Sequence, residues 1–561
     1  MARLGTKVVA DTLRELGQRM ELEGANPYRA RAYRRAAENL SLSPLPLERL
    51  VAEGRLKDIP GIGDALADLI TQLHETGTHP RLATLRKETP ESVLGMLRIP
   101  GLRPERVRKL HKELGIASVG ELEDAARSGR LAATRGFGPA FQAKVLQGLE
   151  MSRGPQGGHL HKADAALRFA TEQLSRAHPN WIEITPAGDF RRGCELVGGL
   201  SLVAVDPDLG GRDKTIEQGD QLVVHVTAPE RFGAALLHAT GSKDHLQALA
   251  AVAVRKGLRM EINGVFKKGR VVAQRTEQDI YAALGLPFIT PELRESGNEV
   301  DLALKGELPE LVTENDLYGV LHAHTTESDG SDSLEAMAEA TRRRGYAYLG
   351  LTDHSQSAHY AGGLKVEEVI AQQRTIDRLN ERYDVRRFQI FKGVESDILA
   401  DGALDYPEEI LASFDLVIAS VHSRFRMSRK EQTDRIVRAV ENSYTTVLGH
   451  MTGRLLTRRP GYEVDIERIL RACSTHGVAI EINANPWRLD MDWRWCQRGL
   501  ELGCMFSINP DAHATGEIDN VRWGVLMARK GGVPKHRVLN ALSLANFRAY
   551  LRARKGRKAR S

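Results

Sequence analysis

The sequence has few cysteines, few aromatic residues and no long apolar stretch. Its four cysteines (Cys194, Cys473, Cys496 and Cys504) form no CxxC pair and no regular framework, which argues against disulfides and thiolate metal sites. No run approaches the roughly 20 consecutive apolar residues that a membrane-spanning helix needs. The N-terminal segment is amphipathic and lacks the apolar core of a signal peptide. We therefore expect a soluble, cytoplasmic protein that binds no membrane.

The length and the charge pattern indicate several domains and a polyanionic partner. A chain of 561 residues is several times the roughly 100 to 200 residues of one compact unit. The net charge of +6 is modest, but Arg and Lys cluster in RARAYRR near residue 30, in LRPERVRKLHK near residue 105 and in the C-terminal LRARKGRKARS. Such clusters suit nucleic acid, although charge alone fits solvated helix faces equally well.

Three glycine-containing turns in the N-terminal region each open into a helical apolar pattern. A loop of free N–H groups at a helix start binds phosphate, and helix-hairpin-helix units use it to contact the DNA backbone without reading sequence. One such turn would more often be an ordinary connection between helices, but three together, two of them beside basic residues, favour DNA binding. The residues assigned to DNA contact here are Pro60, Gly61, Gly63, Pro100, Gly101, Arg103, Gly136 and Gly138.

The middle of the chain contains strand-like runs in WIEITPAGDFRRGCELVGGLSLVAV, joined by a basic turn. This segment, followed by PERFGAALLHATGSKDH and TEQDIYAALGLPFITPELRE, resembles the palm and thumb of bacterial family X DNA polymerases. NPYRARAYRRAAENL and the first hairpin resemble the DNA-end-binding domain of that family, so the resemblance is collinear over nearly the whole chain. We assign Arg191 and Arg192 of the turn to DNA contact as well.

The sequence departs from the family where the polymerase carboxylates should stand. In the family, two aspartates two residues apart face the same side of a strand and, with a third on a neighbouring strand, hold two Mg²⁺ ions. Here the pair reads Gly199-Leu200-Ser201, the neighbouring strand QLVVHV offers only His225, and the family's Gly-Ser for triphosphate is Gly188-Asp189. Mg²⁺ binding at the palm is therefore not favoured.

A second carboxylate pair follows the same strand. Asp206 and Asp208 have the required spacing, but Pro207 between them and the glycines just after them indicate a turn that ends the strand. The palm is therefore interpreted as a scaffold that holds DNA. A gap-filling polymerase that uses Asp206 and Asp208 remains the alternative.

From about Tyr318, seven short apolar runs alternate with helical stretches, as expected of a β/α barrel, and each run ends in polar residues. The C-terminal ends of barrel strands converge on one mouth. Imidazoles and carboxylates without thiolates suit Zn²⁺, Mn²⁺ or Fe²⁺ in a hydrolytic site. The candidate ligands, which we take as the catalytic set, are His322, His324, Asp329, His354, Glu395, His422, His450, Asp511 and His513.

The motifs LHAHTTESDG, LGLTDHS, GVES, SVHS, LGH and PDAH resemble the PHP (polymerase and histidinol phosphatase) family. The resemblance implies three divalent ions. Their expected ligand sets are His322, His324, Glu395 and Asp511 for the first ion, Asp329, His354 and His513 for the second, and Glu395, His422 and His450 for the third.

Several further polar residues stand near these motifs. Arg454 is a candidate phosphate clamp, and Asp353 could orient a ligand imidazole or cap a loop. Glu481, Asn483 and Asn485 could contact substrate or only complete hydrogen bonds around the mouth.

We predict a multidomain α+β and α/β protein. The expected parts are an N-terminal helical domain (1–85), a second helical domain (86–155), a degenerate palm (156–230), a thumb (231–303), a linker (304–316), a distorted (β/α)7 PHP barrel (317–555) and a basic tail (556–561).

The expected function is repair of gapped, nicked or 3′-end duplex DNA by a monomer associated with the nucleoid. Its barrel would act as a 3′–5′ exonuclease, 3′-phosphatase or abasic-site nuclease. The alternatives are a bifunctional polymerase with 3′–5′ exonuclease, a small-molecule phosphatase and a DNA-binding scaffold.

Overall fold

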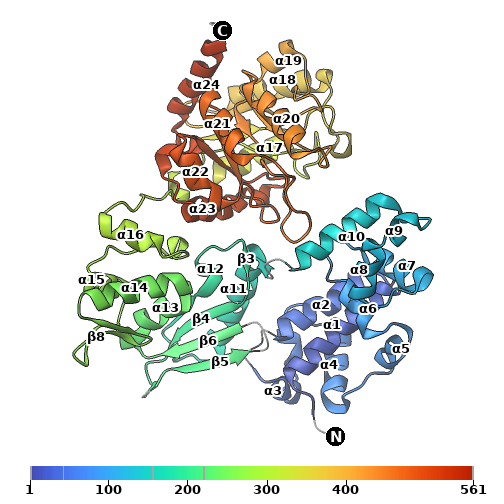
Figure 1. Cartoon of the computed structure of the whole chain (residues 1–561), viewed down its shortest axis with the longest axis vertical. Helices are drawn as coiled ribbons and strands as arrows, with labels where there is room; N and C mark the ends of the chain where they lie inside the picture. The colour runs from blue at the N-terminus through green and yellow to red at the C-terminus, as the bar shows by residue number, and fades with distance from the viewer. Residues whose placement is uncertain are drawn as a thin grey trace. The chain divides into compact units, whose positions relative to one another are not determined.

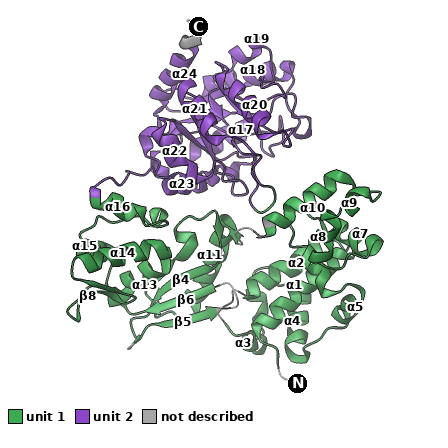
Figure 2. Cartoon of the chain, in the orientation of Figure 1, with its two compact units in different colours: residues 1–304, 457–459 green, residues 305–456, 460–561 purple. Residues whose placement is uncertain are grey.

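The computed structural model describes residues 3–41, 43, 45–153, 157–210, 212–218 and 222–558. The chain divides into two compact units, one of residues Met1–Leu304 with Thr457–Arg459 and one of residues Lys305–Leu456 with Pro460–Ser561 (Figure 2). Across the described residues, no helix is both long enough and apolar enough to cross a membrane.

The first unit begins with a helical region (Figure 1). Val9, Leu13, Leu16 and Met20 lie on one face of the first helix, and they are buried because they recur at helical spacing. Gly17 lets the second helix come close, since a Cβ there would lie 3.0 Å from the carbonyl oxygen of Ala30. The helices are α1 (Thr6–Leu22), α2 (Pro27–Ser41), α3 (Leu47–Ala52), α4 (Asp64–Thr76), α5 (Pro80–Glu88), α6 (Glu91–Met96), α7 (Pro104–Leu114), α8 (Val119–Arg127), α9 (Arg130–Ala133) and α10 (Gly138–Arg153).

The rest of the first unit is mixed α/β. A four-stranded sheet in the order β2-β4-β6-β5 packs through Val203 against Leu236 of α13, and a three-stranded sheet β7-β8-β9 follows. β4 is parallel to β6 and antiparallel to β2. The elements are β1 (Gly158–His159), α11 (Leu160–Ala177), β2 (Glu183–Pro186), α12 (Gly188–Arg191), β3 (Leu196–Val197), β4 (Leu200–Val205), β5 (Lys214–Gln218), β6 (Leu222–Thr227), α13 (Phe232–Thr240), α14 (Lys243–Arg255), β7 (Arg259–Glu261), β8 (Gly264–Lys267), β9 (Arg270–Ala273), α15 (Glu277–Ala283) and α16 (Asn298–Lys305).

The second unit is a seven-stranded parallel sheet whose strands follow chain order. Past the strand ends, the first and last segments meet in a bridge between Ala323 and Ala512, where His324 N–H donates to the oxygen of Ala512 (2.8 Å). This bridge brings the sheet close to a closed barrel. The strands are β10 (Gly319–Val320), β11 (Tyr348–Leu351), β12 (Gln389–Asp397), β13 (Leu416–Ser420), β14 (Val447–Leu448), β15 (Ala479–Asn483) and β16 (Phe506–Asn509).

Helices alternate with these strands, which are buried because helices surround them. At the end of the barrel where the strands begin, Tyr348 stacks on Phe547 of the last helix, with ring centroids 4.7 Å apart. The helices are α17 (Leu334–Arg343), α18 (Val366–Arg382), α19 (Glu408–Ser413), α20 (Arg429–Glu441), α21 (Ile466–His476), α22 (Cys496–Glu501), α23 (Val521–Lys530) and α24 (Leu544–Lys558). The predicted fold classes of both halves are confirmed.

The predicted domain bounds stay predictions, and regular structure enters two of the predicted segments. In the segment expected as a linker, 304–316, α16 continues to Lys305 and Leu311 forms a bridge with Pro534 of the barrel unit. The tail expected at 556–561 begins as the end of α24, and residues 559–561 lie outside the described residues.

Candidate functional site

The strand ends bring all nine predicted ligands to one mouth of the barrel. The Ala323–Ala512 bridge explains part of this convergence, because the neighbours of Ala323 are His322 and His324 and those of Ala512 are Asp511 and His513. Parallel pairing at the closing seam thus places the HAH and DAH motifs side by side.

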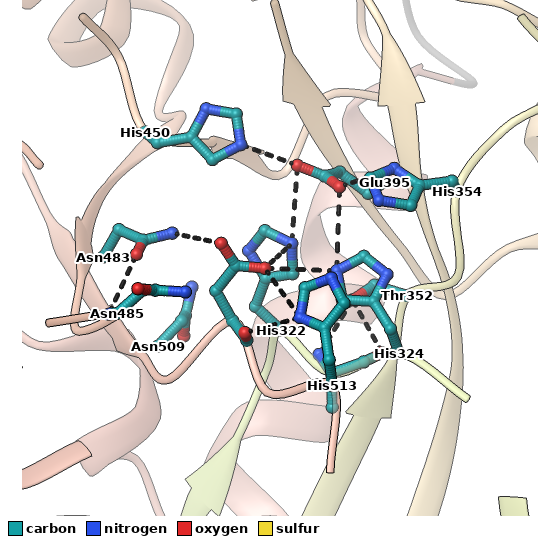
Figure 3. A network of polar contacts seen from close by, with 12 residues as sticks. His322, His324, Thr352, His354, Glu395, His450, Asn483, Asn485, Asn509 and His513 are labelled. Atoms are coloured by element: carbon teal, nitrogen blue, oxygen red, sulfur yellow. Dashed lines mark hydrogen bonds and ion pairs between the residues drawn. The ribbon is translucent and has the colours of Figure 1, made fainter. Parts of the chain in front are cut away.

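Glu395 lies at the centre of the cluster (Figure 3). One of its oxygens, Oε1, is 2.9 Å from Nε2 of His450, 3.3 Å from Nε2 of His422 and 3.4 Å from Nε2 of His322. Its other oxygen, Oε2, is 2.9 Å from Nδ1 of His354 and 3.7 Å from Nε2 of His324. A single buried carboxylate therefore faces five imidazoles.

The remaining carboxylates complete the cluster. Asp511 Oδ1 lies 3.2 Å from Nε2 of His324 and 3.5 Å from Nε2 of His322. Asp329 Oδ1 lies 3.3 Å from Nε2 of His513 and 3.5 Å from Nε2 of His354. Asp511 itself has a φ of 52°, a left-handed conformation that aspartate seldom adopts.

The donor set fits divalent cations. His322 Nε2, both ring nitrogens of His324, and His354 Nδ1 are buried without a hydrogen-bond partner in the described structure. His354 Nδ1 is close to Glu395 without hydrogen-bond geometry, so the two atoms are arranged as neighbouring ligands of one ion would be. Buried nitrogens left without donors or acceptors would be costly unless something else satisfied them.

Among the described residues, three overlapping groups could each hold an ion, and the ligand atoms within each group lie within 4.8 Å of one another. The first matches the predicted first set without Glu395, the second adds His324 to the predicted second set, and the third contains His354 where the prediction has His450. His450 stays beside this third group through its contact with Glu395. The groups are His322, His324 and Asp511, then His324, Asp329, His354 and His513, and finally His354, Glu395 and His422.

The charges of the cluster also favour cations. Burial acts to raise the pKa of Glu395, but His422 and His322 outweigh it and hold this pKa well below the usual range. In the same way, burial would lower the pKa of His422, yet Glu395 and Asp397 raise it to about 9. Burial lowers the pKa of His324 to about 4, which leaves its nitrogens free to act as ligands near neutral pH.

Outer residues orient two of the imidazoles. His322 Nδ1 lies 2.6 Å from Oε1 of Glu481, and His422 Nδ1 lies 2.6 Å from Oδ1 of Asp397. Such contacts fix the tautomer and leave Nε2 free to bind a metal. Sequence reasoning missed Asp397, although it stands two residues after Glu395 on β12 and a strand presents alternate residues on one face.

Asparagines surround Glu481. Asn483 Nδ2 donates to Oε2 of Glu481 and to Oδ2 of Asp511, both at 3.1 Å, and Asn509 Nδ2 donates to Oε1 of Glu481 at 2.9 Å. Asn485 N–H donates to the side-chain oxygen of Asn483 (Figure 3). These residues hold the metal-facing groups in place.

Asp353 organises a neighbouring loop. It accepts hydrogen bonds from the backbone N–H and hydroxyl of Thr325, from the hydroxyl of Ser328 and from Gln372. The loop that Asp353 holds follows His324. These contacts agree with the interpretation of Asp353 as a residue that fixes a loop, and not with the one in which it orients a ligand imidazole.

The candidate phosphate clamp Arg454 has protein partners in the structure, and its phosphate role stays a prediction. Its guanidinium donates to the backbone oxygens of Arg488 and Leu489 and pairs with Asp492 at 2.9 Å, so it braces a loop. Arg488 instead reaches the cluster, with its Nε 3.6 Å from Oδ2 of Asp511. The spacing of residues in the sequence does not predict that Arg488, and not Arg454, reaches the cluster, because both arginines lie in irregular loops.

The palm positions considered in the sequence analysis lie on β4 and in the turn after it. Ser201 stands near the start of β4 beside Gly188, and its buried hydroxyl has no hydrogen-bond partner among the residues that the structure describes. Asp206 and Asp208 lie in a turn after β4, where Asn180 bonds to both. At about 3.3 Å per strand residue, Asp206 is about 16 Å from Ser201 along the strand.

Charged partners occupy the basic turn of the palm. Arg191 forms a two-bond contact with Glu277 (2.8 and 2.7 Å), and Arg192 pairs with Glu295 (2.9 Å) and with Asp189 (2.6 Å). The carboxylate of Asp189 thus has a guanidinium beside it. The predicted DNA contacts of Arg191 and Arg192 would compete with these ion pairs.

The three hairpin turns precede α4, α7 and α10. Gly61, Gly101, Gly136 and Gly138 have φ of 84°, 77°, 89° and 74°, values that favour glycine. Gly63 is the N-cap of α4 and offers no side chain to its first N–H groups. Pro60 accepts a hydrogen bond from Asn39, and Arg103, the exposed N-cap of α7, follows Pro100 and Gly101 in the second turn. Contact of these residues with DNA stays a prediction.

Comparisons with protein-family models match most of these regions. Residues 5–79 match a helix-hairpin-helix domain, and residues 93–146 match a SAM-like helix-hairpin-helix tandem. Residues 235–295 match the DNA polymerase beta thumb, and residues 321–485 match the PHP domain. PHP domains depend on metals, and the barrel has clusters that could hold them. The hairpin and polymerase regions indicate DNA binding.

Relatives match both the whole chain and the barrel alone. The chain is 35% identical over 559 residues to the "DNA polymerase/3′-5′ exonuclease PolX" of Bacillus subtilis (strain 168), covering 95% of this chain and 97% of that protein. It is 28% identical over 251 residues to a "probable phosphatase" of Thermoanaerobacter sp. (strain X514), covering 42% of this chain and 94% of the relative. A "probable phosphatase" of Vibrio parahaemolyticus is 30% identical over 233 residues, 39% of this chain and 87% of that protein.

Proposed function

As this chain belongs to the PolX group of family X DNA polymerases with a C-terminal PHP domain, we propose that it is a DNA-repair hydrolase that cleaves phosphate esters at the mouth of its barrel. The reaction is 3′–5′ exonuclease, 3′-phosphatase or abasic-site cleavage. The observation that carries the proposal is the convergence of nine imidazole and carboxylate groups, Glu395 among them, at one mouth of the barrel, while the palm lacks its carboxylates.

The cluster would hold three divalent ions, Zn²⁺ or Mn²⁺ with Fe²⁺ as a further candidate. The proposed catalytic ligands are His322, His324, Asp329, His354, Glu395, His422, His450, Asp511 and His513. Bound ions would polarise the phosphate ester and lower the pKa of an attacking water.

The residues of the chain prepare this site in two ways. Glu481 and Asp397 keep Nδ1 of His322 and His422 protonated, so that Nε2 of each ring faces the ions. Glu395 bridges neighbouring positions because its two oxygens face different imidazoles. No nucleophilic side chain is needed.

The first unit would bind the DNA substrate. We propose that the hairpin turns at Pro60–Gly63, 100–103 and 136–138 contact phosphates through backbone N–H groups, as helix starts do. Domains 1–85, 86–155, 156–230 and 231–303 would together hold gapped, nicked or 3′-end duplex. We propose that the protein acts as a monomer in the cytoplasm, on the nucleoid.

The polymerase alternative has less support. Asp206 and Asp208 are bound to Asn180 in a turn about 16 Å from the position of the family's carboxylate pair, so they would not hold nucleotide metals there. Mg²⁺ is not expected at the palm. Because the barrel is similar to probable phosphatases, a small-molecule phosphate ester is the alternative substrate. Measuring turnover of histidinol phosphate tests this alternative.

The test is digestion of a labelled gapped duplex with the metal varied. Wild-type protein should shorten the 3′ end, and His322→Ala with His324→Ala should not, while DNA affinity in a gel-shift assay stays the same. His476→Ala with His536→Ala, which changes two exposed histidines of the same unit, is the matched control. Wild-type rates in the His322/His324 variant would place the active site elsewhere.

A further inference from the structure

The space around the metal cluster contains two side chains that the ligand set does not use. Arg488, in the loop after β15, places its Nε 3.6 Å from Oδ2 of Asp511. Tyr360, in the loop after β11, is 70% exposed, and its ring centroid is 6.2 Å from those of both His354 and His422. Both residues therefore border the mouth, one beside Asp511 and the other beside the imidazoles that face Glu395.

Arg488 is held in a fixed position. Its N–H donates to the oxygen of Asn485 at 2.8 Å, and its own carbonyl oxygen accepts from Arg454 at 3.1 Å. The guanidinium is directed at a carboxylate that also faces His322 and His324. A cation bound to that carboxylate would weaken its attraction for Arg488 and would leave the planar donor fork available to a phosphate oxygen.

Tyr360 is an exposed aromatic on a firmly anchored loop. Leu364 N–H donates to the oxygen of His354 at 2.9 Å and closes the loop at its base. The neighbours of Tyr360 in the loop, Ala358 and Ala361, are buried. At Gly363 the chain passes so near itself that a Cβ would lie 1.9 Å from the oxygen of Ser355. The backbone of the loop is thus held in place, and it carries the exposed ring of Tyr360 at the rim of the mouth.

We propose that Arg488 and Tyr360 form a nucleotide subsite at the barrel mouth, in which Arg488 binds the phosphate and Tyr360 stacks on the base of the terminal nucleotide. The inference rests on the proposed function and narrows its substrate to nucleotide ends. An aromatic ring stacks on any base, so the subsite would favour nucleotides over simple phosphate esters without choosing a sequence.

The experiment measures equilibrium binding of a deoxynucleoside monophosphate and of inorganic phosphate to metal-loaded protein. Arg488→Met should weaken both by about 10- to 100-fold, as expected for a charge-assisted hydrogen bond, and Arg488→Lys should recover part of the loss. Tyr360→Ala should weaken only the nucleotide, by about 5- to 100-fold, and Tyr360→Phe should bind like the wild type.

Controls use the other end of the barrel unit, where Arg386 and Tyr318 are also exposed. Arg386→Met and Tyr318→Ala should bind both ligands normally. Metal content is measured for every variant, because loss of metal in Arg488→Met would mean that Arg488 only holds Asp511 and would overturn its phosphate role. Equal weakening of phosphate and nucleotide in Tyr360→Ala, or no weakening of either, would overturn the stacking role.

The outcome is separable from that of the proposed function. If the wild type leaves DNA uncut but binds the nucleotide more tightly than phosphate through Tyr360, the hydrolase proposal fails and the subsite stands. If DNA is cut while all variants bind both ligands normally, the subsite fails alone.

Discussion

Replacing Glu481 by glutamine should weaken metal binding without removing any ligand. The carboxylate accepts four hydrogen bonds, with His322 Nδ1 (2.6 Å) and Asn509 (2.9 Å) on Oε1, and the N–H of His450 (2.7 Å) and Asn483 (3.1 Å) on Oε2. Burial would raise its pKa, but His322 outweighs burial and the pKa is lowered, so Glu481 is ionised. In the glutamine variant, the side-chain NH₂ takes the place of one carboxylate oxygen, so it must face the two hydrogen-bond donors that this oxygen had accepted from.

The two asparagines can rotate their side-chain amides to present an oxygen. The ring of His322 and the backbone N–H of His450 cannot adjust in this way. If the NH₂ faces His322, the ring must accept at Nδ1 and carry its proton on Nε2, the atom that faces Asp511 and Glu395. A ring in that tautomer cannot bind an ion there. Loss of such a supporting group costs about 10- to 100-fold in metal affinity, or about 1.4 to 2.7 kcal/mol, close to the ~1.5 to 3 kcal/mol of one hydrogen bond to a charged group.

The assay is titration of Zn²⁺ or Mn²⁺ in chelator buffers, with metal content measured by elemental analysis. Glu381→Gln, an exposed change on α18, is the matched control and should leave affinity unaltered. DNA cleavage by Glu481→Gln should be low at limiting metal and recover at high metal. A folded Glu481→Gln barrel with wild-type metal affinity would refute the reasoning, because the imidazole would then not need its carboxylate.

Other predictions concern DNA, the palm and metal removal. DNA affinity should fall with salt at a log–log slope of about −0.9 for each phosphate contacted, and a binding constant equal at low and physiological salt would exclude this mode. Glu277→Gln should destabilise the first unit by about 3 to 5 kcal/mol in urea unfolding, because it breaks the buried pairs with Arg191 and Arg294. Burial acts to raise the pKa of Glu277, but these arginines lower it below 4.5. The stability advantage of glutamate over glutamine should therefore be present above pH 4.5. It should vanish as the pH falls through the pKa of Glu277 in the folded state. A deficit that persisted in acid would contradict the ion-pair account. Chelation should lower the unfolding temperature of the barrel unit in calorimetry and leave the first unit unchanged, whereas equal shifts would contradict a barrel site.

Much of the barrel site was predictable because regular structure converts sequence order into position. Each of the seven apolar runs became a strand, and parallel strands carry their end residues to one mouth, so residues as distant in sequence as His322 and Asp511 were expected at the same mouth. Their division among three ions came from the resemblance to the PHP family. The position of Asp397 beside the cluster also follows from regular structure. Asp397 stands two residues after Glu395 on the same strand, and alternate residues of a strand face the same side.

Loop side chains could not be predicted in this way. Arg454 and Arg488 both follow barrel strands, and only the path of the loop decides that Arg454 pairs with Asp492 while Arg488 reaches Asp511. Likewise, Glu277 is 86 residues from Arg191, and no periodicity links them. Long-range ion pairs depend on packing between elements, which a single sequence does not specify.

The most direct test of the account is one reaction on a labelled gapped duplex with all four deoxynucleoside triphosphates and Mg²⁺ or Mn²⁺, run with the wild type and with Asp511→Ala. The account predicts that the wild type shortens the primer and that Asp511→Ala leaves its length unchanged, because the barrel has lost a ligand and the palm has only Gly199, Leu200 and Ser201 where nucleotide metals would bind. Template-directed extension by Asp511→Ala, above all if Asp206→Ala abolished it, would contradict the account.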